Sequence, residues 1–209
     1  MSGGTEPVSL GGESALDEED RARADIYGVL ARLWYRAPDR ELLDALAGNT
    51  ERDEAHAPPL ARAWGALAKA AADADPEALT HEYDSLFVGT GRAEITLYCS
   101  HYLTETGRER VVVALREKLR ELGLGRSGGT SEPEDHFSAL LEVMRHLIVQ
   151  GSDVPQIEVQ KQFFLRYIHG SYTALTDAVA NNGGAGFYKE IARVTRAFLD
   201  VESQSMDML

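Results

Sequence analysis

Residues 131–137 read Ser-Glu-Pro-Glu-Asp-His-Phe, and this stretch decides the fold that the sequence predicts. Ser131 is a favourable N-cap, and Glu134 three residues later completes a Ser-x-x-Glu capping box that satisfies two backbone N–H groups. Proline in a first helical turn loses no hydrogen bond, and acidic residues there suit the positive end of the helix dipole. We therefore predict that a helix begins at Ser131.

The residues that follow have the period of an amphipathic helix. Asp135 and Glu142 are seven residues apart and lie on one side of this helix, with His136 beside Asp135. A well-capped core helix, whose acids serve only the dipole, has the same pattern. Apolar residues recur at steps of three and four as far as Gly151: Phe137, Leu140, Leu141, Met144, Leu147 and Ile148.

Two further segments carry a resemblance to a known family. Residues 82–89 read Glu-Tyr-Asp-Ser-Leu-Phe-Val-Gly, and residues 98–103 read Tyr-Cys-Ser-His-Tyr-Leu. The motifs Tyr-x-x-Leu-Phe, Ser-x-Tyr and, at 132–136, Glu-Pro-x-Asp-His follow the order and rough spacing of TorD-type chaperones. Members of that family mature molybdenum-containing oxidoreductases and proofread twin-arginine signal peptides. The chain resembles them from about Asp20 to Glu202.

Two positions depart from the pattern of the family. Leu97 stands where many relatives have proline, and Gly170-Ser171 stands where many have Pro-Trp. The second difference removes a large aromatic side chain from the C-terminal half.

The resemblance implies a function and a client. It indicates a cytoplasmic, non-enzymatic chaperone that binds the twin-arginine signal peptide, the apo-form, or both, of a molybdopterin oxidoreductase catalytic subunit until the cofactor is inserted. The segment around Gly89 to Leu103 is most similar to members associated with formate dehydrogenases, and a dimethyl sulfoxide reductase-type client is the alternative. Some relatives bind guanine nucleotide weakly, but no motif of this sequence supports that site. No cofactor or metal is expected in the chaperone itself.

A twin-arginine peptide offers a basic pair followed by an apolar stretch, so its receptor needs carboxylates beside a hydrophobic groove. The resemblance implies that the motif segments meet in space to form such a site. For Leu86 and Phe87, plain core packing is an equal alternative. The candidate peptide-binding residues are Tyr83, Leu86, Phe87, Tyr98, Ser100, Tyr102, Glu132, Asp135, His136, Phe137 and Glu142.

Composition excludes several other classes of protein. A net charge of −13 argues against nucleic-acid binding and favours cationic partners or simple solubility. One cysteine rules out an internal disulfide framework. No segment reaches the roughly 20 apolar residues that span a bilayer, so we expect no membrane insertion. Residues 1–18 are expected to form a disordered acidic leader without signal-peptide features.

The remaining periodicity predicts an all-α bundle of roughly eight to ten helices. Four glycines in the segment 123–130 predict a hinge between an N-terminal lobe, 19–122, and a C-terminal lobe, 131–202, with a frayed tail at 203–209. Such a hinge allows either a monomer or a domain-swapped homodimer. Helices are expected near 19–35, 39–47, 60–74, 75–87, 103–122, 131–150, 156–180 (with a kink at Gly170) and 187–201, with 93–102 irregular.

Two functions from other classes compete with the chaperone. One is a small hydrolase or nucleotide-using enzyme centred on Cys99, His101 and His136, although neither an oxyanion-hole pattern nor a phosphate-binding loop accompanies them. The other is an adaptor that binds a folded partner through an acidic helical surface. A metal site from the same histidines and His146 is disfavoured, because His136 and His146 point in different directions around one helix.

Overall fold

Helices form most of the structure, a computed structural model that describes residues 16–48, 57–89, 91–125, 133–151 and 153–208. The predicted all-α class is confirmed: the described residues form ten α-helices and two π-helical segments, and Tyr98 and His136 form an isolated β-bridge. The elements are α1 (Glu18–Tyr35), α2 (Arg40–Ala47), α3 (Pro59–Ala72), α4 (Pro76–Tyr83), η1 (Asp84–Val88), α5 (Ser100–Leu103), α6 (Arg108–Glu121), α7 (Phe137–Gln150), α8 (Val154–Phe163), η2 (Phe164–Ile168), α9 (His169–Ala180) and α10 (Phe187–Met208).

Aspartate side chains begin four of these helices. Asp17, Asp39, Asp75 and Asp153 each accept a hydrogen bond from the backbone N–H group three residues ahead. Each bond satisfies a donor that has no partner inside the helix, and each carboxylate lies at the positive end of the helix dipole. The helix starts near residues 18, 40, 76 and 154 therefore follow from local sequence.

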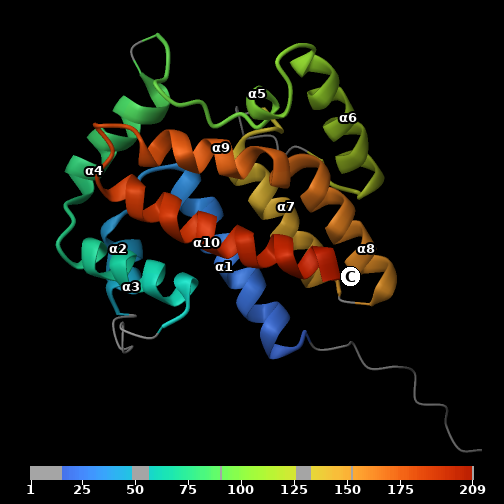
Figure 1. Ribbon diagram of the computed structural model, residues 1–209, viewed down its shortest axis with the longest axis horizontal. Coiled ribbons are helices and arrows are strands. Elements are labelled where there is room, and N and C mark those ends of the chain that lie inside the picture. Colours follow the sequence, from blue (N-terminus) through green and yellow to red (C-terminus); the bar gives the residue numbers. More distant parts are fainter. Residues whose placement is uncertain (1–15, 49–56, 90, 126–132, 152, 209) are drawn as a thin grey trace, which may run out of the picture.

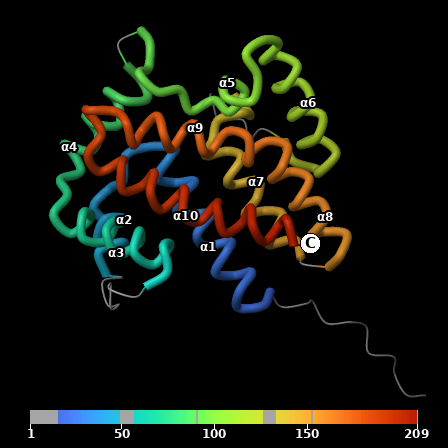
Figure 2. The backbone as a smooth tube through the Cα atoms, viewed as in Figure 1, coloured from blue at the N-terminus to red at the C-terminus, as the bar shows by residue number. Residues whose placement is uncertain are grey.

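Helix α1 lies at the centre of the bundle, between α7 and α10. Figure 1 shows α10 crossing the molecule with α9 along one side and α3 on the other, and Figure 2 shows the same arrangement along the backbone. Trp34 of α1 is fully buried and packs edge-on against Phe87, Phe137 and Tyr188. Its indole N–H donates to the Thr195 hydroxyl at 2.9 Å. One side chain thus joins η1, α7 and α10.

A buried polar cluster holds α1 to the end of α10. Arg23 donates two hydrogen bonds to the Glu202 carboxylate, at 2.9 and 3.0 Å, and Tyr27 donates a third at 3.0 Å. Glu202 is only 3% exposed, so these partners compensate a charge that burial would otherwise make costly.

The C-terminal tail differs from the prediction. We expected residues 203–209 to fray, but α10 continues to Met208, and Met206 is only 2% exposed. The apolar face of α10 extends one more turn because Met206 reaches the core.

The helix predicted to begin at Ser131 begins six residues later, at Phe137. Residues 133–136 are not helical, and α7 begins at Phe137 with the His136 ring as its cap. Ser131 and Glu132 lie outside the described residues, and Glu134 pairs with Arg116 of α6 at 3.0 Å. The backbone between Pro133 and His136 is held by partners distant in sequence, which the local capping pattern does not show.

Two further helices have boundaries that the periodicity missed. The helix expected near 103–122 begins only at Arg108, after a turn at Gly107, which has a φ of 74°. The helix expected at 156–180 is divided into α8, the π-helical segment η2 and α9, and Gly170 lies within α9.

The halves on either side of the glycine-rich segment share one core. A single hydrophobic cluster contains Leu30, Leu67, Phe137 and Phe198, which come from both predicted lobes. Residues 126–132 and 1–15 lie outside the described residues, so the hinge, the division into lobes and the leader stay predictions.

Candidate functional site

Two motif segments that are separate in sequence lie side by side. The Cys99 N–H donates to the Asp135 carbonyl at 2.8 Å, and the Phe137 N–H donates to the Leu97 carbonyl at 2.8 Å. The Ser100 N–H donates to the Asp135 carboxylate at 3.3 Å. Asp135 is 3% exposed, so its main chain and side chain together fix the segment 97–100 against the start of α7.

A close contact between α5 and α9 holds the chain that follows the segment 97–100. The side chain of Leu103 lies so near Gly170 that a Cβ atom there would come within 2.8 Å of Leu103 Cδ2. Next to it, the Ser171 hydroxyl is fully buried and donates to the Ile168 carbonyl at 2.9 Å. The small Gly170-Ser171 pair therefore lets α5 approach α9 closely.

His136 lies between two exposed tyrosines. The ring of Tyr98 is 5.8 Å from the His136 ring, and the ring of Tyr35 is 6.3 Å away on the α1 side, both edge-on. Tyr35 is 45% exposed and Tyr98 is 37% exposed, whereas His136 is only 5% exposed. The His136 Nδ1 atom accepts from the Ser138 N–H at 3.3 Å. We call Tyr35, Tyr98 and His136 the tyrosine–histidine surface.

Tyr83 and Tyr102 hold the backbone near the tyrosine–histidine surface through hydrogen bonds of their hydroxyl groups. The Tyr83 hydroxyl donates to the Tyr35 carbonyl at 2.7 Å, and the Tyr102 hydroxyl donates to the Thr96 carbonyl at 2.9 Å. Both tyrosines are half-buried. Their hydroxyl groups fix the backbone that carries the exposed rings.

Other candidate residues are part of the core. Leu86 is 1% exposed, and Phe87 and Phe137 pack on Trp34. We predicted an apolar wall from these side chains, but their burial leaves no face for a peptide, so the core alternative describes them. Ser100 is also buried and contributes its backbone N–H.

The candidate carboxylates do not form one cluster in the described residues. Asp135 is buried and engaged with backbone, whereas Glu142 is exposed on α7 and pairs with Arg145 at 3.3 Å. Glu132 lies outside the described residues. Exposed ion pairs contribute little to stability, so Glu142 is able to exchange Arg145 for a cation of a partner.

Cys99 and its neighbouring histidines do not form a catalytic group. Cys99 is 1% exposed, and burial raises the pKa of its thiol to about 12. His101 is exposed and packs against Tyr102 rather than against His136. The described residues contain no group of three or more potential metal ligands. A nucleophile needs an accessible thiolate, which this position does not supply.

Sequence reasoning missed Tyr35 and the π-helical segment η1. Tyr35 ends α1 and has an ordinary helical environment in sequence, so only the tertiary contact with His136 distinguishes it. Segment η1 carries Leu86 and Phe87 of the Tyr-x-x-Leu-Phe motif and is followed by Gly89, whose φ is 65°. A Cβ atom at Gly89 would lie 2.2 Å from the Arg92 carbonyl oxygen, so the turn requires glycine. Gly89 is therefore the residue from which this turn could have been predicted.

Comparison with known proteins assigns the family. A family model described as nitrate reductase delta subunit matches residues 53–171, which is more than half of the chain. The chain belongs to this family. Curated members that it resembles are TorD-type chaperones, and the matched range contains all the motif segments described above.

Three relatives show how far the likeness extends. The chaperone TorD of Shewanella loihica is 24% identical and covers 90% of this chain and 94% of its own. The TorD of Ferrimonas balearica is 26% identical and covers 91% of both chains. The crystal structure of a protein described as a redox enzyme maturation protein from Archaeoglobus fulgidus has a TM-score of 0.58 at 21% identity. It covers 94% of this chain and 99% of its own, and it shows the same fold.

The protein is a maturation chaperone of the TorD type and not an enzyme. Across the described residues, none of the helices is both long and apolar enough to cross a bilayer.

Proposed function

We propose that this TorD-type chaperone acts in the cytoplasm and binds the twin-arginine signal peptide of a molybdopterin oxidoreductase catalytic subunit before cofactor insertion. The tyrosine–histidine surface is the proposed binding site. The observation that carries this assignment is the exposure of Tyr35 and Tyr98, which are the two exposed aromatic side chains of the described residues and both contact His136. Aromatic side chains that are rigid and partly exposed are common anchors of peptide interfaces.

The chemistry of the surface suits both parts of the peptide. The tyrosine rings offer apolar faces to the hydrophobic stretch and a cation–π partner to an arginine. Glu142, on the exposed side of α7, offers a carboxylate to the other arginine. Asp135 and Ser100 position the surface from beneath without touching the peptide.

Titration calorimetry with signal peptides of molybdoenzymes from the same source tests the proposal. We expect one peptide to bind, and Tyr98→Ala or Tyr35→Ala to weaken it about tenfold, since exposed aromatic anchors contribute roughly 1–2 kcal/mol. Val113→Ala, which shortens an exposed side chain on α6, is the matched control and should bind normally. Wild-type affinity in both tyrosine variants would show that the peptide binds elsewhere. The absence of binding to any signal peptide would contradict the proposed function.

Lysine in place of the twin arginines separates the chaperone from an adaptor for a folded partner. The chaperone should lose affinity, whereas an adaptor would bind neither peptide. Formate dehydrogenase and dimethyl sulfoxide reductase-type enzymes supply the first peptides to test. The proposed binding applies to a monomer and equally to a domain-swapped homodimer, in which residues 123–130 would connect the exchanged helices.

A further inference from the structure

Helices α1 and α7 lie side by side along the edge that begins at the tyrosine–histidine surface. Tyr35 of α1 contacts His136 just before α7, and seven residues earlier Gly28 of α1 contacts the Arg145 side chain of α7. The two helices therefore run antiparallel. Residues seven apart lie on one side of a helix, so Gly28 is on the edge of α1 that carries the exposed Tyr35 ring, about 10 Å away along the axis.

Gly28 leaves room for an arginine side chain on this edge. Glycine in the middle of a helix is less favourable than alanine, so its presence in α1 needs a reason. A Cβ atom at Gly28 would come within 3.0 Å of Arg145 Cδ and 3.1 Å of Arg145 Nε, and the three atoms nearest to it all belong to Arg145. The packing of the two helix backbones therefore does not require the glycine. Only a flexible surface side chain occupies the space that it leaves.

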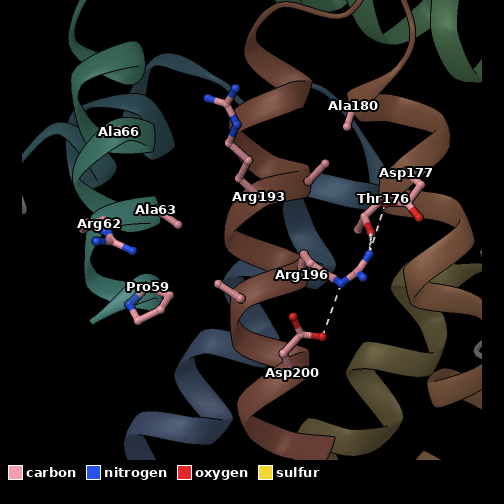
Figure 3. A pocket seen from close by; sticks show the side chains of 12 residues that line it. Pro59, Arg62, Ala63, Ala66, Thr176, Asp177, Ala180, Arg193, Arg196 and Asp200 are labelled. Atoms are coloured by element: carbon pink, nitrogen blue, oxygen red, sulfur yellow. Dashed lines mark hydrogen bonds and ion pairs between the residues drawn. The ribbon is translucent and has the colours of Figure 1, made fainter. Parts of the chain in front are cut away.

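Arg145 is held weakly in this place. Within the described residues its one ion-pair partner is Glu142, at 3.3 Å, and both side chains are about half exposed. Arg196 of α10 shows the contrast, because it pairs with both Asp177 and Asp200, at 3.2 and 3.3 Å (Figure 3). An exposed pair between residues three apart contributes little to stability, so Arg145 can leave Glu142 at small cost.

The charge that remains without this arginine is negative. Glu142 loses its partner, and Asp25, one turn before Gly28, is exposed and has no ion pair with any described residue. Arg32, one turn after Gly28, already pairs with Asp39 at 2.8 Å. A cationic side chain is therefore the ligand that this edge attracts.

We infer that Arg145 is an internal competitor of the signal peptide, and that an arginine of the peptide replaces it on Gly28 and Glu142. We call Gly28 and Glu142 the arginine subsite. In the free protein Arg145 occupies this subsite. When the peptide binds, its guanidinium group donates to the Glu142 carboxylate and Arg145 turns toward solvent. The inference rests on the signal-peptide function proposed above and adds to it the residue that opposes binding.

The position of the arginine subsite also gives the direction of the peptide. Three extended residues span the distance of about 10 Å between Gly28 and Tyr35. The apolar stretch of the peptide follows its arginines, so it reaches Tyr35 and Tyr98 when an arginine lies on Gly28. The bound peptide therefore runs in the same direction as α1.

Titration of the full chain with a designed peptide tests the inference. The peptide has two adjacent arginines followed by alternating leucine and alanine, and calorimetry measures its Kd. Exposed ion pairs at this spacing are joined about two-thirds of the time, so Arg145→Gln should tighten binding about threefold. Arg21→Gln is the matched control, because it removes the same charge from an exposed side chain on the same edge of α1. It should change the affinity much less.

Two double variants locate the bound arginine. Gly28→Ala combined with Arg145→Gln places a methyl group in the subsite while Glu142 stays unpaired, so the threefold gain should be lost. Glu142→Gln combined with Arg145→Gln should bind no more tightly than Glu142→Gln alone, because the ion pair is then absent from both. Alanine is favourable in helices, and circular dichroism checks that each variant keeps its fold.

Two results would overturn the inference. Equal effects of Arg145→Gln and Arg21→Gln would mean that only the overall charge matters. A gain in Arg145→Gln that survives the addition of Gly28→Ala would mean that the arginine of the peptide lies elsewhere.

Signal peptides of molybdoenzymes, titrated in parallel, separate this inference from the proposed function. If they bind without the expected pattern of variants, the arginine subsite is wrong and the function stands. If the designed peptide shows the pattern but no signal peptide binds, the function alone is contradicted. The absence of binding by either kind of peptide, to the wild type and to Arg145→Gln, would contradict both.

Discussion

Asp135 illustrates how one side chain sets the geometry of the candidate site. Asp135→Ala leaves the buried Ser100 N–H without its acceptor, and we expect the free energy of unfolding to fall by about 1–3 kcal/mol. Asp135→Asn keeps an acceptor oxygen and should lose much less. Urea unfolding measures both values. Signal-peptide binding should weaken in the alanine variant, since Tyr98 loses part of its anchor, and a fully stable alanine variant would contradict this role.

Cys99 gives a second prediction for a single residue. Its thiol is buried and its pKa is raised to about 12, so we expect a thiol reagent to label the native protein far more slowly than the protein in denaturant. The rate of labelling in the native protein should be set by how often the structure opens around Cys99. Rapid labelling of the native chain at neutral pH would show that Cys99 is accessible after all.

Sequence and structure agree least where partners are distant. The motif at 132–136 contains Asp135 and His136, but its capping-box interpretation placed them in a helix. Asp135 instead binds the N–H of a residue 35 positions earlier, which no local pattern reveals. Tyr35 was missed for the same reason.

At the level of whole helices, periodicity predicted most elements well because their caps are local. Asp17, Asp39 and Asp75 define helix starts through side chains within three residues. Segments η1 and η2 were not predicted, because a π-helical turn differs from an α-helical one in its i→i+5 hydrogen bonds, which no residue type in these segments signals. The end of α10 was underestimated because Met206 packs on distant residues.

The last turns of α10 supply a prediction at this scale. Met206→Ala should lower the free energy of unfolding by about 2 kcal/mol or more, as is usual for buried methionine. Met208→Ala is the matched control, because Met208 is 82% exposed, and it should change stability little. Thermal unfolding of both variants measures the difference. Equal effects would show that the tail frays, as the sequence had suggested.

For the whole molecule, buried tyrosines predict loss of stability at alkaline pH. Burial raises the pKa of Tyr27 and of Tyr188 well above the ordinary value, and that of Tyr102 to about 12. Unfolded tyrosines ionise near pH 10, so above that pH the unfolded state releases protons that the folded state retains. The contribution of these tyrosines to the free energy of unfolding is therefore complete below about pH 10 and is lost as the pH rises further.

Urea unfolding at pH 8 and pH 11 measures this loss. Each fully buried tyrosine should remove about 1.4 kcal/mol per pH unit above pH 10. Tyr188→Phe should show a smaller drop between the two pH values, although it also loses the hydrogen bond to the Leu33 carbonyl. An unchanged drop in this variant would mean that Tyr188 ionises freely in the folded protein.

The joining of α1 to α10 has a consequence for synthesis on the ribosome. Arg23 and Glu202 are 179 residues apart, and α10 is the last described helix to be translated. Until it emerges, Arg23 has only Asp20 as its partner, and Tyr27 and Trp34 of α1 lack their contacts with Phe198 and Tyr188, so the nascent chain cannot close its core. Closure of the core therefore waits for α10, and the helices made earlier stay exposed to proteases and to other chaperones until α10 leaves the exit tunnel.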